Sequence, residues 1–248
     1  MKRSMIAEKI INYLEDRVNC DNAIFFAQNH KSKHNELIIN EVPVSYQVIL
    51  YDEDIEEDNA EIKRIYDEHL FITQANATGF EIFPYLYGVL NCHEGADSKV
   101  YVYYEKFPSN LIDTIQSISH TSEWYDIAFQ LSIINFYIQV VSSMDYTCSL
   151  DDHVCKKYDK PFYKKYELEN SVVTINHKYL INLWDFELKT PLLISEKPTS
   201  PNITLLLQYL ETEKVPIAPS PKIVNFLKQV EKDPTNTLLI ISKYYEEK

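Results

Sequence analysis

The segment from residue 127 to residue 141 is apolar on nearly every side of a helix, and this limits how the chain can fold. One helical stripe consists of Ile127, Leu131, Ile134, Ile138 and Val141. A second stripe consists of Phe129, Ile133, Phe136 and Val140. A helix that is apolar all round must be covered on all sides. The sequence therefore predicts a central core helix around which other elements pack.

The charge of the chain limits its partners. It has 24 basic and 37 acidic residues, which gives a formal net charge of -13. No cluster of lysine and arginine stands out as a phosphate-binding stripe, so nucleic acid is disfavoured as a ligand, and so are anionic membranes. The first residues lack the apolar core of a signal peptide. No segment reaches the roughly 20 apolar residues of a membrane helix, so we expect a soluble protein.

The four cysteines are scattered along the chain and form no Cys-x-x-Cys pair. This pattern favours a reducing compartment over a disulfide framework. Cys148, His153 and Cys155 are close enough in sequence to suggest a zinc site. A closed zinc site needs four ligands, however, and the usual paired spacing is absent, so small packed side chains are the favoured interpretation.

Hydrophobic periodicity predicts a β-rich front half and a mostly helical back half. An amphipathic helix is expected over residues 4–18, and a second helix follows the acidic run at 52–58. Strands are expected at 44–51, 83–90 and 99–104 in the front half, and at 172–175 and 179–184 further on. Helical patterns return at 203–210, 223–230 and 238–245.

Several segments resemble parts of a eukaryotic-type protein kinase in the same order. Residues 103–107, Tyr-Tyr-Glu-Lys-Phe, resemble the hinge between two lobes, and residues 179–187 end in Asp-Phe-Glu where a kinase has Asp-Phe-Gly. With the Lys/Tyr-rich stretch at 162–166 and the helix start at 200–207, the chain resembles the kinase-like proteins of nucleocytoplasmic large DNA viruses.

This resemblance implies an α+β, bilobal protein-kinase-like fold. Residues 1–106 would form a capping helix and a small β-rich N-lobe with one helix, and residues 107–248 a mainly helical C-lobe. By the same resemblance, Asp185 would be the magnesium ligand, and Asp185 and Glu105 would line an ATP site.

The residues that phosphoryl transfer requires are largely missing from the expected positions. The chain has 3 glycines and none before Gly79, so no glycine-rich loop can cover phosphates. The position of the phosphate-binding lysine holds Tyr51, and only Lys31 or Lys33 could replace it. Further candidates are a helix carboxylate, from Glu61 or Glu68, and a catalytic loop at 146–155. That loop aligns with Cys148 as the base and His153 as the metal ligand, or alternatively places Asp151 or Asp152 near the base.

From the resemblance and these losses we expect a catalytically inactive viral pseudokinase with no catalytic residues and no cofactor. It would act by binding a protein, such as a viral or host kinase or a virion component, in the host cytoplasm or the virion. One alternative is a divergent Ser/Thr kinase that uses ATP and Mg through Asp185 with Asp151 or Asp152. Another is a virion structural protein that reuses the fold.

Overall fold

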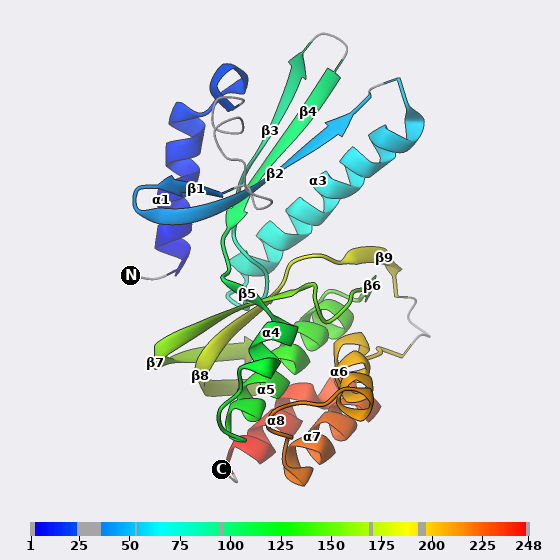
Figure 1. Cartoon of the computed structure of the whole chain (residues 1–248). Helices are drawn as coiled ribbons and strands as arrows, with labels where there is room; N and C mark the ends of the chain where they lie inside the picture. Colours follow the sequence, from blue (N-terminus) through cyan, green and yellow to red (C-terminus); the bar gives the residue numbers. More distant parts are fainter. Residues whose placement is uncertain are drawn as a thin grey trace. The chain divides into compact units, whose positions relative to one another are not determined.

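The computed structural model describes residues 3–23, 36–52, 54–94, 97–168, 171–192 and 197–246. The chain divides into two compact units, Met1–Lys106 and Phe107–Lys248. Each unit has its own sheets and helices (Figure 1). Within the described residues, no helix is both long and apolar enough to cross a membrane.

The first unit contains a four-stranded antiparallel sheet in the order β1-β2-β4-β3. The strands are β1 (Glu36–Ile39), β2 (Val42–Tyr51), β3 (Leu86–Glu94) and β4 (Asp97–Glu105). Two helices, α1 (Arg3–Arg17) and α3 (Glu56–Ala77), lie on opposite faces of this sheet (Figure 1). The helices predicted at the N-terminus and after the acidic run are therefore confirmed, and so are the three strands predicted in this part of the chain.

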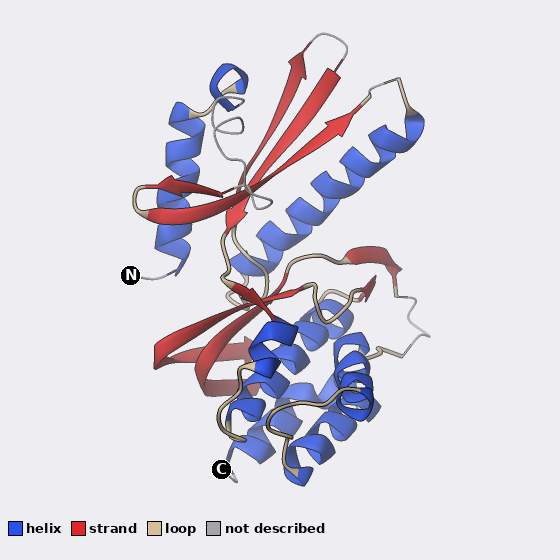
Figure 2. Ribbon diagram, viewed as in Figure 1, coloured by secondary structure: helices blue, strands red, loops and turns tan. Residues whose placement is uncertain are grey.

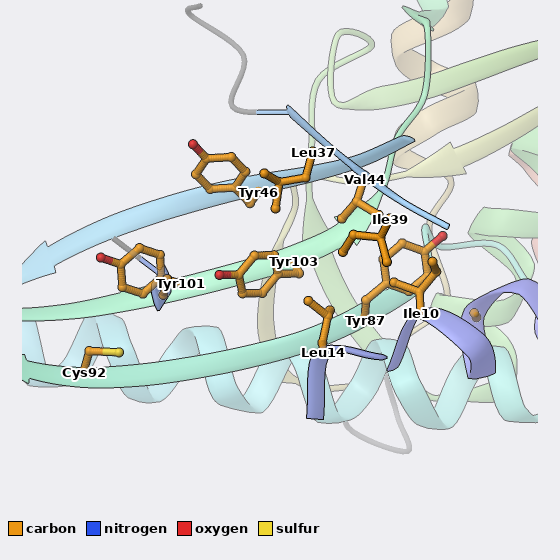
Figure 3. Packing of buried hydrophobic residues seen from close by; sticks show 12 residues of the cluster. Ile10, Leu14, Leu37, Ile39, Val44, Tyr46, Tyr87, Cys92, Tyr101 and Tyr103 are labelled. Atoms are coloured by element: carbon orange, nitrogen blue, oxygen red, sulfur yellow. The ribbon is translucent and has the colours of Figure 1, made fainter. Parts of the chain in front are cut away.

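Alternation along β4 explains why both faces of the sheet are covered. Tyr101 and Tyr103 pack with Ile10 and Leu14 of α1 in one buried cluster (Figure 3). The intervening residues of β4, Val100 and Val102, pack with Ile62 and Ile65 of α3 in another. Because successive side chains of a strand point to opposite faces, the apolar stretch from Val100 to Tyr103 needs a helix on each side.

A disulfide bond joins Cys20, just after α1, to Cys92 in β3. The two residues are 72 positions apart in sequence, and their Cα atoms are 5.4 Å apart. The prediction of unpaired cysteines is therefore wrong for this pair, whereas Cys148 and Cys155 are free thiols. The sequence could not indicate the pairing, because it depends on how α1 packs against β3.

The elements of the second unit pack around one buried helix. This helix, α5 (Glu123–Phe136), continues as a π-helical turn, η1 (Tyr137–Val141). The other helical elements of the unit are α4 (Leu111–Gln116), α6 (Pro201–Thr212), α7 (Pro221–Lys232), η2 (Pro234–Asn236) and α8 (Thr237–Glu246). In α5 every residue from Ile127 to Phe136 is buried, which confirms the prediction of a central core helix.

The strands of the second unit form two small antiparallel sheets. One has the order β5-β7-β8, from β5 (Ser109–Asn110), β7 (His153–Leu168) and β8 (Ser171–Leu183). The other pairs β6 (Met144–Thr147) with β9 (Glu187–Pro191). Figure 2 shows β7 and β8 as a long hairpin beside the helices of this unit. The two short strands predicted at 172–175 and 179–184 are parts of the single strand β8.

The structure is of the α+β class, but the bilobal protein-kinase-like fold expected from the resemblance is wrong. The β structure is divided among several small sheets, and a kinase fold is not shown. The second unit, expected to be mainly helical, contains a 16-residue and a 13-residue strand. The resemblance depended on the order of local patterns along the chain, and that order does not specify which strands pair.

Candidate functional site

Asp185, the expected magnesium ligand, lies in an exposed bend between β8 and β9. The backbone N–H groups of Trp184 and Asp185 both face the carbonyl oxygen of Asp152, at 2.8 and 3.4 Å. Across the described part of the chain, no three His, Cys, Asp or Glu side chains are grouped so that they could hold a metal ion. The two backbone contacts to Asp152 help to fix the bend.

Glu105, the other residue expected at an ATP site, anchors the start of α1. Its carboxylate accepts hydrogen bonds from Arg3 Nε, at 2.8 and 3.0 Å, and from the backbone N–H of Tyr85 at 3.2 Å. The same guanidinium donates to the carbonyl oxygens of Glu81 and Phe83. Burial opposes the charge of Arg3, but Glu105, together with Glu81 and Tyr85, outweighs burial and raises the pKa of the arginine. Sequence analysis missed this role because Arg3 is 102 residues away from Glu105.

The other residues considered for phosphate binding have structural neighbours or are not described. Lys31 and Lys33 lie outside the described residues. Tyr51, at the expected lysine position, donates a hydrogen bond from its hydroxyl to Asn91 Oδ1 at 2.9 Å. Glu68 accepts from Arg64 one helical turn earlier, and Glu61 is exposed on α3.

The segment expected to be a catalytic loop is tied to α6 instead. Cys148 Sγ donates to Asn202 Oδ1 at 3.0 Å, and the carboxylate of Asp152 accepts from the backbone N–H of Ser149. Burial raises the pKa of Cys148 to about 12 and lowers the pKa of His153 to about 4. Both side chains are therefore neutral near pH 7, so the thiol is a poor nucleophile.

A different feature of the second unit stands out, which we call the lysine-rich hairpin and define as β7 and β8. Strand β7 carries five lysines against two acids, although the whole chain has a net charge of -13. The lysines of β7 are Lys156, Lys157, Lys160, Lys164 and Lys165. Three of them stack on tyrosine rings at 5.2 to 5.5 Å, namely Lys156 on Tyr158, Lys157 on Tyr179 and Lys164 on Tyr166. These cation–π contacts keep the ammonium groups of these three lysines close to the hairpin.

The outer edge of β8 is closed by side chains from the helices. Asp126 of α5 accepts from the backbone N–H groups of Lys178 and Tyr179, at 2.6 and 2.7 Å. Gln130 accepts from the N–H of Ile181 and donates to the carbonyl oxygen of Tyr179. Tyr245 of α8 receives the N–H of Asn176 at 3.3 Å. Helices thus satisfy this edge where a further strand would otherwise pair.

The outer edge of β7 is different. Its only strand neighbour on that side within the described residues is β5, which pairs with Val154 and Cys155 alone. From Lys156 to Leu168 the edge has no strand partner among the residues that the structure describes. Tyr163, on this stretch, is 74% exposed. The sequence did carry a signal for this hairpin, because Lys-Lys-Tyr occurs twice, at 156–158 and at 164–166.

No family model matches the chain, but comparison with known proteins finds a viral relative. The relative is a protein of Acanthamoeba polyphaga mimivirus described as uncharacterized protein R691. It is 38% identical to the chain over 272 aligned positions, which cover 99% of each protein. The expectation that the chain is related to a protein of a large DNA virus is confirmed, because the relative comes from such a virus. The chain belongs to the same family as this mimivirus protein.

Proposed function

We propose that this protein is a non-catalytic binding protein that acts by contacting another protein through the lysine-rich hairpin. The observation that carries the proposal is the outer edge of β7, where an exposed tyrosine and several lysines lie on a stretch that has no strand partner among the described residues. Exposed strand edges readily pair with other chains, and aromatic side chains are enriched in protein interfaces. A viral or host kinase or a virion component remains the proposed kind of partner.

The absence of catalysis is proposed from the surroundings of the expected reactive groups. Phosphoryl transfer depends on positioned cations and carboxylates around the phosphates. The carboxylate of Glu105 is occupied by Arg3, and Asp185 lies in an exposed bend. Cys148, which is half-buried, and His153, which is buried, are neutral near pH 7 because loss of solvent disfavours their charged forms. Glu105 and Cys148 instead make hydrogen bonds within their own units.

Photocrosslinking at two matched tyrosines tests the binding function. A photoreactive phenylalanine derivative replaces Tyr163 on β7 or, as control, Tyr66 on α3, which is also exposed. We expect a discrete protein adduct at position 163 in infected cells and none of the same mass at position 66. Identical adducts at both positions, or none at position 163, would contradict the proposal.

A thermal-shift titration tests the absence of nucleotide chemistry. A ligand at a hundred times its Kd stabilises a protein by about 2.7 kcal/mol, which is readily measured. We expect ATP with Mg²⁺ to leave the melting temperature unchanged. Stabilisation together with phosphate transfer that Asp185→Ala abolishes would show that the protein is an enzyme.

A further inference from the structure

The register of the hairpin shows which backbone groups of β7 point away from β8. Tyr163 is opposite Asn176, whose N–H is used by Tyr245 on the far side of β8. In an antiparallel pair, a residue that points its backbone groups outward faces a partner that does the same. Tyr163 therefore directs its N–H and C=O outward, and so does Lys165, two residues further on. Tyr163 and Lys165 both lie on the stretch of β7 that lacks a strand partner among the described residues.

The side chains along this edge carry positive charge on both faces of the strand. Tyr163 and Lys165 are on the exposed face, where Lys165 also forms an ion pair with Glu167 at 2.7 Å. That pair is more than half exposed and contributes little to stability, so it does not tie up the lysine strongly. Lys164 lies on the other face, over the ring of Tyr166. A strand added beside β7 would therefore meet a lysine on either face.

These features favour an acidic peptide over other ligands. A peptide strand can use the outward N–H and C=O groups together, whereas a nucleic-acid phosphate can use only the N–H donors. A second copy of β7 would bring the same excess of five lysines over two acids, and like charges brought together destabilise a strand pair. Acidic side chains on an incoming strand would instead meet opposite charge on each face.

We propose that β7, between Phe162 and Glu167, binds an acidic, extended segment of the partner protein as an additional strand. This inference rests on the proposed function, because it specifies the mode of binding at the same hairpin. Main-chain hydrogen bonds along the edge would supply affinity, and the lysines would select acidic sequences. The lysines also protect the edge from pairing with chains that lack acidic residues.

Two synthetic peptides serve as probes with the full-length protein. One has about eight residues, the length of a short strand, in which Glu alternates with Thr and Val. The other has Lys in place of each Glu. Fluorescence anisotropy should show at least about tenfold tighter binding of the acidic peptide, a difference of about 1.4 kcal/mol. Binding should weaken as the salt concentration rises from about 0.1 to about 0.5 M. Equal binding of the two peptides would overturn the inference.

Two substitutions of Tyr163 separate backbone pairing from side-chain contact. Tyr163→Pro removes the outward N–H but leaves the ladder to β8, because this position makes no hydrogen bond to β8. Tyr163→Ala removes the ring and keeps the N–H. We expect the proline variant to bind the acidic peptide at least about tenfold more weakly than the alanine variant. Equal affinities of two folded variants would overturn strand addition.

Charge variants provide a second test that does not alter the backbone. Lys164→Glu combined with Lys165→Glu should abolish binding of the acidic peptide. Lys228→Glu combined with Lys232→Glu, on exposed positions of α7, makes the same change in net charge and should leave binding unchanged. Equal losses in both variants would show that only overall charge matters and would overturn the inference.

The remaining outcomes separate this inference from the proposed function. A single-stranded oligonucleotide that binds as tightly as the acidic peptide would assign the lysines to nucleic acid and overturn the inference. A protein adduct at position 163 that persists with Lys164→Glu and Lys165→Glu would leave the binding function standing and refute the acidic strand. Loss of the adduct with these lysine changes supports both.

Discussion

The buried carboxylate of Glu123 links two elements of the second unit. Its side chain is only 4% exposed and receives hydrogen bonds from Lys178 Nζ at 2.5 Å and Tyr179 Oη at 2.6 Å. Burial alone would raise the pKa of this carboxyl group. The hydrogen bonds from Lys178 and Tyr179 outweigh burial and lower the pKa to about 2. The ionised form therefore joins the start of α5 to β8.

Glu123→Gln should destabilise the second unit by about 2 kcal/mol at pH 7, because it removes charge-assisted hydrogen bonds. The folded-state pKa is below the usual carboxyl value, so this stabilisation is complete above about pH 5 and is lost as pH falls towards 2. Urea unfolding of both proteins at several pH values checks this. The expected result is a difference that shrinks in acid, and a constant difference from pH 7 to pH 3 would contradict it.

The residues that the sequence marked as ligands show why residue-level prediction has a limit. Glu105 and Asp185 were selected by their local motifs, and nothing near Glu105 in sequence indicates Arg3. In the same way, the neutral state of the Cys148 thiol follows from its burial, and the local sequence does not indicate that burial. Residue identity determines which chemistry is available, and distant neighbours determine whether it is used.

At the scale of elements, helix α1 depends on the sheet of the first unit. Ile10 is fully buried, and the disulfide joins the segment after α1 to β3. Closing a loop of this length restricts the unfolded chain and typically stabilises a fold by about 2 to 4 kcal/mol. The helix was predictable from its periodicity, but its covalent attachment was not.

Cys20→Ser combined with Cys92→Ser should lower the free energy of unfolding of the first unit by about 2 to 4 kcal/mol. Thermal unfolding followed by far-UV circular dichroism measures the effect. Reducing agent should shift the wild type by a similar amount and leave the double variant unchanged. Cys148→Ser is the matched control, since Cys148 is a free thiol, and it should not abolish the response to reductant.

At the scale of the whole molecule, the chain consists of two compact units. Both tryptophans, Trp124 and Trp184, belong to the second unit. Trp124 is fully buried and donates from its indole N–H to the carbonyl oxygen of Ile217 at 2.7 Å. Tryptophan fluorescence therefore reports on the second unit, whereas circular dichroism reports on both.

We expect the two units to respond separately to changes in their own cores. Glu123→Gln should lower the midpoint of the tryptophan transition, and the double cysteine variant should leave that midpoint unchanged while altering the circular dichroism transition. Parallel melts with the two signals provide the measurement. Equal shifts of both signals in the double cysteine variant would show that the units unfold as one.

The sequence by itself determined most of the elements, because periodicity and turn residues act over a few positions. It predicted α1, α3 and the central helix α5, and it placed β2, β3, β4 and the last three helices close to where they lie. Tertiary structure alone decided the pairing of β2 with β4, the disulfide, the Arg3–Glu105 ion pair and the edge of β7 that has no strand partner among the described residues. Each of these joins or separates residues far apart in the chain, and local sequence preferences do not encode such distances.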